Sequence, residues 1–334
     1  MKKLFYLLAI MAAACLAVVP ATSQNRSGKV EIVVPKDYRA MQLRPSPELQ
    51  TMLGNSVNEL LSSYNGKFKP EEIAATIIDL RDPNDLKTAS VRGEEKIYPA
   101  SVVKMFYMAA LERQLADGKV TSTKELERGL RDMIVDSANE ATQYILDVLT
   151  DTSSGAELPA KEFEAWLYKR NRVNRFYSSM GYQNINTNQK TFCEDAYGIE
   201  QQSRNFPTNA ANRNKLTTNA TARLLAEIVL GKMNTPERTK QMMDLMKRDP
   251  FITTTDLDKQ DNGFSGKLFL DRKMKDVKLW SKAGWTSTAR HDAAYIETAD
   301  GLKFVIVTFT ENHANDREPI PTIVGKLMDL MRKN

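Results

Sequence analysis

Residues with high strand propensity gather in two groups, one near each end of the chain. The first group covers residues 73–80 and 88–91, which are separated by an Asp-Pro-Asn turn. The second covers residues 277–282, 291–296 and 302–310, with an Ala-Asp-Gly turn before the last of them. Short connections of this kind join antiparallel strands. The pattern therefore predicts one antiparallel sheet whose two halves come from opposite ends of the chain.

The block between the two groups shows mostly helical spacing of apolar side chains. We therefore predict an α/β (α+β) protein, with an antiparallel sheet flanked by helices in an α/β domain formed by residues 46–98 and 266–334. An all-α domain at 99–265 would be inserted into it, and an active site is expected at the seam. Residues 181–216 break the helical pattern with Asn, Gln and small polar side chains, which predicts a long surface loop of the omega type.

Residues 1–23 have the composition of a secretory signal peptide, with two lysines before an apolar run and small residues before Gln24. Cleavage there predicts a periplasmic or secreted protein. Cys15 raises a lipoprotein alternative, which ranks second because no Leu stands three residues before it. Residues 24–45 are expected to form an arm or linker, in which the Val-rich stretch 30–34 is compatible with a short strand.

Charge and composition argue against nucleic-acid, metal and membrane-spanning functions. The formal charge of +5 over 334 residues falls to +3 without the two signal-peptide lysines, and the cations form no cluster. No later stretch is apolar for long enough to cross a membrane. His291 and His313 have no partners at metal-ligand spacing, so neither a metal nor another cofactor is expected. Cys193 would be the only cysteine of the mature chain, and composition leaves the oligomeric state open.

The stretch from Tyr98 to Lys104 is the first candidate for catalysis. Pro99 and a small Ala lead into Ser101, and Lys104 opens an apolar helical run. Positions i and i+3 share one face of a helix, so the serine hydroxyl and the lysine amine can meet. A serine becomes a useful nucleophile when a neighbouring base takes its proton. A capping serine followed by a solvated lysine is the plain structural alternative.

A second candidate, Ser137-x-Asn139, interrupts a helical pattern. Side chains at i and i+2 diverge on a helix, so these two face one target only if a turn breaks the helix there. The hydroxyl could then relay a proton to a leaving group, and the amide could orient a substrate carbonyl or the lysine. In isolation, a helix N-cap would be the better interpretation.

The third candidate, Lys282-x-Gly284, ends a predicted strand. Gly284 would allow another backbone to approach closely, and a strand edge can bind an extended acyl substrate. Lys282 adds positive charge for a substrate carboxylate, and Arg290 could place a second cation near the same anion. The alternative is a solvated lysine followed by a turn glycine.

Taken in order, the three motifs resemble the signatures of class A β-lactamases and penicillin-binding proteins. Residues 133–141 resemble the family's segment through its second motif, and residues 217–225 resemble the helix after its omega loop. Residues 282–286 with 291–294 look like the final strand pair of these serine hydrolases. The resemblance covers about residues 46–333.

The resemblance implies a role for each matching residue. Ser101 would be the nucleophile, Lys104 its proton acceptor, and Ser137 the group that passes the proton to the leaving nitrogen. The substrate would be bound by Asn139 and Lys282. Gly284, Trp285 and Arg290, which lie in the third motif or shortly after it, would complete the substrate-binding site. The backbone N–H groups of Ser101 and Trp285 would form the oxyanion hole.

Two departures from the family pattern concern the walls of the expected cleft. The interval from Ser101 to Ser137 is shorter than in typical class A enzymes, which suggests a trimmed wall. Ala283 stands where the family commonly has Thr or Ser, which removes a hydroxyl near the substrate carboxylate.

A third departure concerns deacylation, because the loop lacks a clear Glu-x-x-Leu-Asn. In the family this glutamate activates the water that releases the acyl group. Glu200 is the favoured candidate from its distance before Thr217, although Arg204 stands where Asn is expected. Glu194 is the second candidate, with Asp195 behind it. Solvated loop carboxylates remain the alternative for all three.

The leading functional hypothesis is an exported class A-like serine β-lactamase that works through an acyl-Ser101 intermediate. One rival is a penicillin-binding-protein-like peptidase that acts on D-Ala-D-Ala ends of peptidoglycan. Another is a β-lactam-binding or scaffold protein without turnover. The expected partners are thus small β-lactams or peptidoglycan peptides.

Overall fold

The computed structural model describes residues 31–191 and 195–333. The chain divides after Glu31, and the unit that begins at Ile32 contains all the elements named below. The predicted signal peptide, Cys15 and the start of the arm lie outside the described residues. Within the described ranges, no helix has the length and apolar character needed to span a membrane.

A seven-stranded sheet is built from both ends of the chain, in the order β1-β3-β2-β7-β6-β5-β4. At its centre β2 pairs antiparallel with β7, with Ile73 opposite Thr310 and Asp79 opposite Phe304. The prediction of one sheet from opposite chain ends is thus confirmed. The strands are β1 (Arg44–Pro45), β2 (Ile73–Asp79), β3 (Lys87–Val91), β4 (Lys247–Arg248), β5 (Lys278–Trp285), β6 (Ala289–Glu297) and β7 (Lys303–Glu311).

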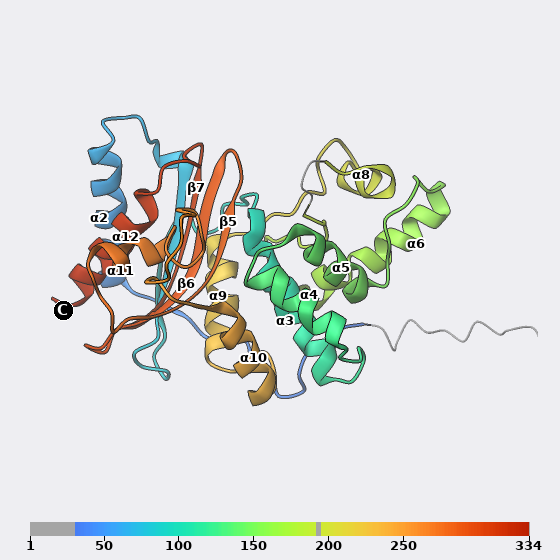
Figure 1. Cartoon of the computed structure of the whole chain (residues 1–334), viewed down its shortest axis with the longest axis horizontal. Helices are drawn as coiled ribbons and strands as arrows, with labels where there is room; N and C mark the ends of the chain where they lie inside the picture. The colour runs from blue at the N-terminus through green and yellow to red at the C-terminus, as the bar shows by residue number, and fades with distance from the viewer. Residues whose placement is uncertain (1–30, 192–194, 334) are drawn as a thin grey trace, which may run out of the picture. The chain divides into compact units, whose positions relative to one another are not determined.

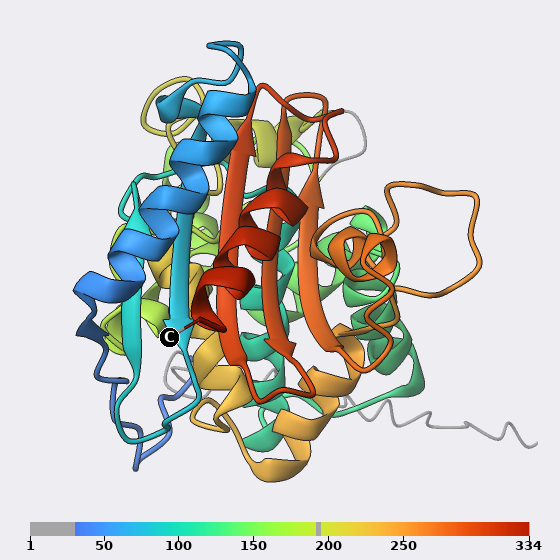
Figure 2. The same ribbon diagram turned by 90° about the vertical axis from the view of Figure 1, so that its left-hand side faces the viewer.

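Helices cover both faces of the sheet. Figures 1 and 2 show α2, α11 and α12 on one face, with α9 and α3 on the other and the remaining helices beyond them. The helices are α2 (Pro47–Ser63), α3 (Val103–Ala116), α4 (Lys124–Ile134), α5 (Asn139–Thr150), α6 (Ala160–Arg170), α7 (Arg172–Ser179), α8 (Gly198–Arg204), α9 (Thr218–Val229), α10 (Pro236–Met246), α11 (Ser265–Asp271) and α12 (Pro319–Met331), with the 3-10 helices η1 (Pro70–Glu72) and η2 (Ala100–Val102).

The strand β2 shows why helices are needed on both faces. Every one of its residues is buried, and successive side chains point to opposite sides of a sheet. Ile77 packs in the core under α2 and α12, whereas Ile78 packs in the core on the helical side. A strand with this continuous apolar run is stable only between two layers. The α/β fold class is therefore confirmed, and the division into two domains stays a prediction.

The arm differs from the expectation of a strand at 30–34. Residues 31–34 form no strand, and Ile32 is instead buried as a side chain in the core of the helical side. The strand of the arm is β1, which pairs in parallel with β3 through Arg44 opposite Lys87. Apolar composition therefore indicated one buried side chain here, Ile32, whereas Val33 is 47% exposed.

The segment 181–216 is only in part the surface loop that its composition predicted, since residues 206–209 are exposed whereas 187–191 are buried. Residues 187–191 are at most 7% exposed, and α8 lies within the segment. Its backbone groups are hydrogen-bonded to amide side chains in place of a neighbouring strand. Asn214 Oδ1 accepts hydrogen bonds from the backbone N–H of Asn188 at 3.1 Å and of Gln189 at 2.9 Å. Polar residues without periodicity therefore mark a buried, side-chain-bonded segment, because buried backbone groups need partners of some kind.

Candidate active site

Ser101 lies where the chain enters the helix that carries Lys104. Pro99 leads into η2, and Ala100 has a left-handed backbone with φ of +47°. The chain then continues directly into α3, so Lys104 follows Ser101 by one helical turn as predicted. Ser101 is half-buried and lines a cavity of about 320 Å³.

Strand β5 passes directly against the turn that holds Ser101. A Cβ added at Gly284 would lie 2.7 Å from the carbonyl oxygen of Pro99 and 3.0 Å from the backbone nitrogen of Ser101. Real Cβ atoms do not approach backbone atoms that closely, so this position requires glycine. The close backbone approach predicted for Gly284 is what the structure contains.

The predicted break in the helix occurs at Ser137. Helix α4 ends at Ile134 and α5 begins at Asn139, and between them Ser137 has a left-handed φ of +56°. The turn brings both motif side chains to Lys104. Its Nζ donates hydrogen bonds to the Ser137 carbonyl oxygen at 2.5 Å and to Asn139 Oδ1 at 2.9 Å, with Ser137 Oγ at 3.3 Å.

Lys282 approaches the same serine from the sheet. Its Nζ lies 3.0 Å from Ser137 Oγ, 2.5 Å from Gln260 Oε1 and 2.8 Å from the Ala283 carbonyl oxygen. Complete burial, together with the positive charges of Lys104 and Arg248, holds the pKa of Lys282 well below its ordinary value. A depressed pKa favours the neutral amine, whose N–H still donates a hydrogen bond to Ser137 Oγ.

Gln260 is a site residue that the sequence did not reveal. It lines the cavity, and its Oε1 also accepts from the Ala283 N–H at 3.1 Å. Its Nε2 donates to the Val135 carbonyl oxygen at 2.8 Å, so one side chain joins β5 to the turn that carries Ser137. A single glutamine in a polar loop carries no sequence signal that would have identified it.

The structure brings Trp285 to the cavity but not Arg290. Trp285 is 47% exposed and lines the cavity. Lys282 pairs with Ala293 across the strands, so Arg290, three residues before Ala293 along β6, projects from the other face of the sheet. The buried guanidinium of Arg290 donates to Asp258 at 2.8 Å and to the Gly263 carbonyl oxygen at 2.5 Å. Arg290 therefore supports the loop beside the cavity, and the expectation that it binds substrate is corrected.

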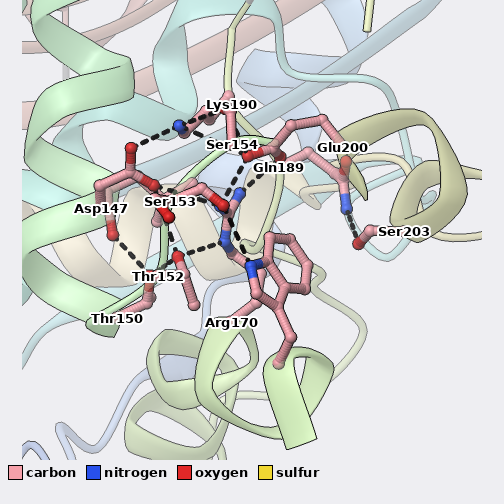
Figure 3. Close-up of polar contacts among 12 residues, drawn as sticks. Asp147, Thr150, Thr152, Ser153, Ser154, Arg170, Gln189, Lys190, Glu200 and Ser203 are labelled. Carbon is pink, nitrogen blue, oxygen red and sulfur yellow. Dashed lines mark hydrogen bonds and ion pairs between the residues drawn. The ribbon is translucent and has the colours of Figure 1, made fainter. Parts of the chain in front are cut away.

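Glu200, the favoured candidate for deacylation, lies in a buried ion network instead of the cavity (Figure 3). Both carboxylate oxygens accept from Arg170, each at 2.8 Å, and Oε1 also accepts from Ser154 Oγ at 2.9 Å. Lys190 Nζ lies 3.4 Å from Oε1 and 2.5 Å from Asp147 Oδ2. Burial raises the pKa of Glu200, but the charges of Arg170 and Lys190 outweigh it and lower the pKa overall.

The arrangement therefore gives Glu200 a structural role rather than that of a base for the hydrolytic water. Its lone pairs are directed at Arg170, and it is only 1% exposed. Asp195, the third candidate, forms an ion pair with Arg204, the residue that stands where Asn was expected. Glu194 lies outside the described residues.

We predict that Glu200→Gln lowers the free energy of unfolding by about 3 kcal/mol, because Arg170 is left buried beside a neutral amide. The release of a bound penicilloyl group should change by less than about threefold. Chemical denaturation and intact-mass time courses measure the two effects, with exposed Glu164→Gln as the control. Unchanged stability together with a hundredfold slower release would restore Glu200 as the base.

His291 shares a sheet face with Lys282 and holds the strand that leads to Ser101. Its Nδ1 accepts from the Thr310 N–H at 3.1 Å, so its Nε2–H donates to the Tyr98 carbonyl oxygen, 3.0 Å away. This arrangement requires a neutral imidazole. Burial lowers the pKa of His291 from 6.5 to about 4.

We predict that the free energy of unfolding falls by about 3 kcal/mol as the pH drops from about 6.5 to 4, because in this window the unfolded chain binds a proton that the folded chain does not. The contribution is complete above pH 6.5. Urea denaturation across this range should show the slope in the wild type and in His313→Gln, and a reduced slope in His291→Gln. Equal slopes in all three proteins would contradict the assignment.

Comparisons with known proteins agree on the fold. The structure resembles a class A beta-lactamase from Bacteroides cellulosilyticus with a TM-score of 0.60 and 14% identity, over 86% of this chain and 99% of that one. It resembles PBP-A with a TM-score of 0.58 and 16% identity, over 89% of this chain and 100% of that one. It resembles a beta-lactamase from Sphaerobacter thermophilus with a TM-score of 0.58 and 17% identity, over 85% of this chain and 96% of that one. No curated protein matches the chain.

The sequence also matches a family model. The match covers residues 52–327, which include all three motifs and every strand except β1. The family is described as the beta-lactamase enzyme family. The chain therefore belongs to the beta-lactamase enzyme family.

Proposed function

We propose that this protein is an exported serine hydrolase that opens β-lactam amides through an acyl intermediate on Ser101. The observation that carries the proposal is the convergence of Lys104, Ser137 and Lys282 beside the cavity that Ser101 lines. The amines of Lys104 and Lys282 both lie beside the hydroxyl of Ser137, and this arrangement provides a path for a proton between the nucleophile and a leaving nitrogen.

The proposed acylation begins with proton transfer from Ser101 Oγ to the neutral amine of Lys104. Oγ attacks the lactam carbonyl carbon, and the carbonyl oxygen becomes an oxyanion. The N–H groups of Ser101 and Trp285 flank Gly284, whose lack of a side chain lets them converge on that oxygen. The C–N bond then breaks, and the ring nitrogen takes the proton of Ser137 Oγ, which Lys104 replaces with the proton that it took from Ser101.

The nitrogen donors around Ser137 also suit the substrate's carboxylate. Lys104, Lys282 and Arg248 are all buried, and Arg248 donates to the Ile134 carbonyl oxygen at 3.1 Å, close to the same turn. A negatively charged β-lactam would be drawn toward the guanidinium of Arg248, because charges interact more strongly where water is excluded, and its carboxylate could accept a hydrogen bond from Lys282. Asn139, fixed by Lys104, can orient the substrate amide.

A second candidate function, a D-Ala-D-Ala peptidase or a protein that retains β-lactams without turnover, is favoured by the position of Glu200. With both of its oxygens bound by Arg170, this carboxylate offers no base to a hydrolytic water. Acylation by the steps above would then be followed by slow release. Nitrocefin hydrolysis supports the lactamase, whereas an acyl-enzyme that persists for hours in intact-mass spectra supports the second function.

We predict that Ser101→Ala abolishes the mass increase caused by a penicillin, because it removes the hydroxyl that would carry the acyl group in the cavity. The thermal midpoint should stay within about 2 °C of the wild type, since a half-buried hydroxyl is replaced by hydrogen. Ser62→Ala, an exposed serine on α2, is the control and should label fully. Labelling of Ser101→Ala at the wild-type rate would disprove the assignment of the nucleophile.

We further predict that the mature protein begins near Gln24, because residues 1–23 have the pattern of a signal peptide. N-terminal sequencing of the protein from the periplasm or culture medium measures the position of cleavage. A lipid-modified Cys15 as the first residue would establish the lipoprotein alternative.

A further inference from the structure

A second cavity, of about 100 Å³, lies beside Tyr98, three residues before Ser101. Its charged lining consists of Lys190, Asp195, Arg204 and Arg213, and two amide side chains complete it. None of these residues lines the cavity that contains Ser101. The acylation steps proposed above do not use this cavity.

Arg213 contributes a guanidinium group to the lining of this cavity. The group is stacked on the ring of Tyr98, with its Cζ 4.3 Å from the ring centroid. Among the described residues its side chain takes part in no hydrogen bond and no ion pair. Stacking fixes the plane of a guanidinium but leaves its N–H edge available. The Tyr98 carbonyl oxygen is in turn hydrogen-bonded by His291, so the tyrosine on which Arg213 stacks has a fixed position.

Arg204 contributes a second guanidinium to the same lining. One of its terminal nitrogens forms the ion pair with Asp195, and its Nε is buried without a hydrogen-bond partner. A buried N–H group without a partner costs free energy that an oxyanion would recover. The carboxylate of Asp195 is already bound by Arg204 and by the Ala196 N–H at 2.7 Å, and these contacts hold its pKa below the usual range.

The remaining charges near the cavity cancel one another. Figure 3 shows the Lys190 amine turned toward Asp147 and Ser154, and its distances to them are 2.5 and 2.8 Å. Lys190 and Arg170 are balanced by Asp147 and Glu200, and Arg204 is balanced by Asp195. Among the described residues, Arg213 is in no ion pair, although its charge contributes to lowering the pKa of Asp195, and it lines the same cavity as Arg204, whose Nε–H is unsatisfied.

We propose that this cavity is a subsite for a single oxyanion group, a carboxylate or a phosphate. The N–H groups of Arg213 and Arg204 and the phenol of Tyr98 would donate hydrogen bonds to it, and guanidinium groups match the planar geometry of such anions. Two sources of the anion share this chemistry: a carboxylate on the acyl side of the substrate, which rests on the proposed function, and a free anion bound independently of it.

The first experiment measures anion binding without any reaction. Thermal melting of the full chain is followed while inorganic phosphate replaces chloride at constant ionic strength. The melting temperature of the wild type should rise and saturate, as binding to the folded state requires. Arg213→Met should weaken phosphate binding about 10- to 100-fold, and the exposed Arg39→Met should not. Identical titrations of wild type and Arg213→Met, or no saturable rise in either, would overturn the proposal.

The second experiment identifies the source of the anion. Carbenicillin and benzylpenicillin differ only by a carboxylate on the acyl side chain, and the ratio of their acylation rate constants is measured by intact mass. A ratio that falls about tenfold in Arg213→Met, and in wild type with added phosphate, assigns the subsite to the substrate. An unchanged ratio with lost phosphate binding assigns it to a free anion. If neither penicillin acylates the wild type, the proposed function fails, and the phosphate titration still decides the subsite.

Discussion

The buried amine of Lys104 connects the parts of the site to one another. It is held by the carbonyl oxygen of Ser137, in the turn between α4 and α5, and by Asn139, the first residue of α5. A charged or neutral amine that is completely buried needs such partners, because desolvation is costly without them. The lysine therefore fixes the position of the turn, and the turn fixes the position of the lysine.

The sheet reaches the same point through Gly284 and Lys282. Glycine lets β5 lie against the backbone of Ser101, and Lys282 then extends from the strand to Ser137. Gln260 links the strand to the same turn, because its Nε2 donates to the Val135 carbonyl oxygen. The site is thus assembled from strand, helix and loop by a connected set of buried and half-buried hydrogen bonds, which makes its geometry rigid.

Polar residues perform a second, structural task behind the site. The network of Arg170, Glu200, Lys190 and Asp147 joins α5, α6 and α8 to the buried segment at 187–191. Tyr107, on the helix of Lys104, donates to the Gln189 carbonyl oxygen at 2.7 Å, so this segment also packs against α3. A buried ion network of this kind stabilises little by itself, but the loss of one partner is costly. The ion network therefore holds the polar segment 187–191 in a single conformation.

The sequence alone determined the strands at the two ends of the chain, the helix after Ser101 and the turn at Ser137, because each depends on local periodicity or on the chemistry of neighbouring residues. The ordered motifs also indicated the family. The tertiary structure alone decided which polar residues share a site. Arg290 was misassigned because the face of a strand depends on register, and Glu200 because a loop carboxylate is free or paired according to residues distant in sequence, here Arg170 and Lys190. Gln260 was missed for the same reason, since hydrogen bonds between distant segments leave no periodic trace in the sequence.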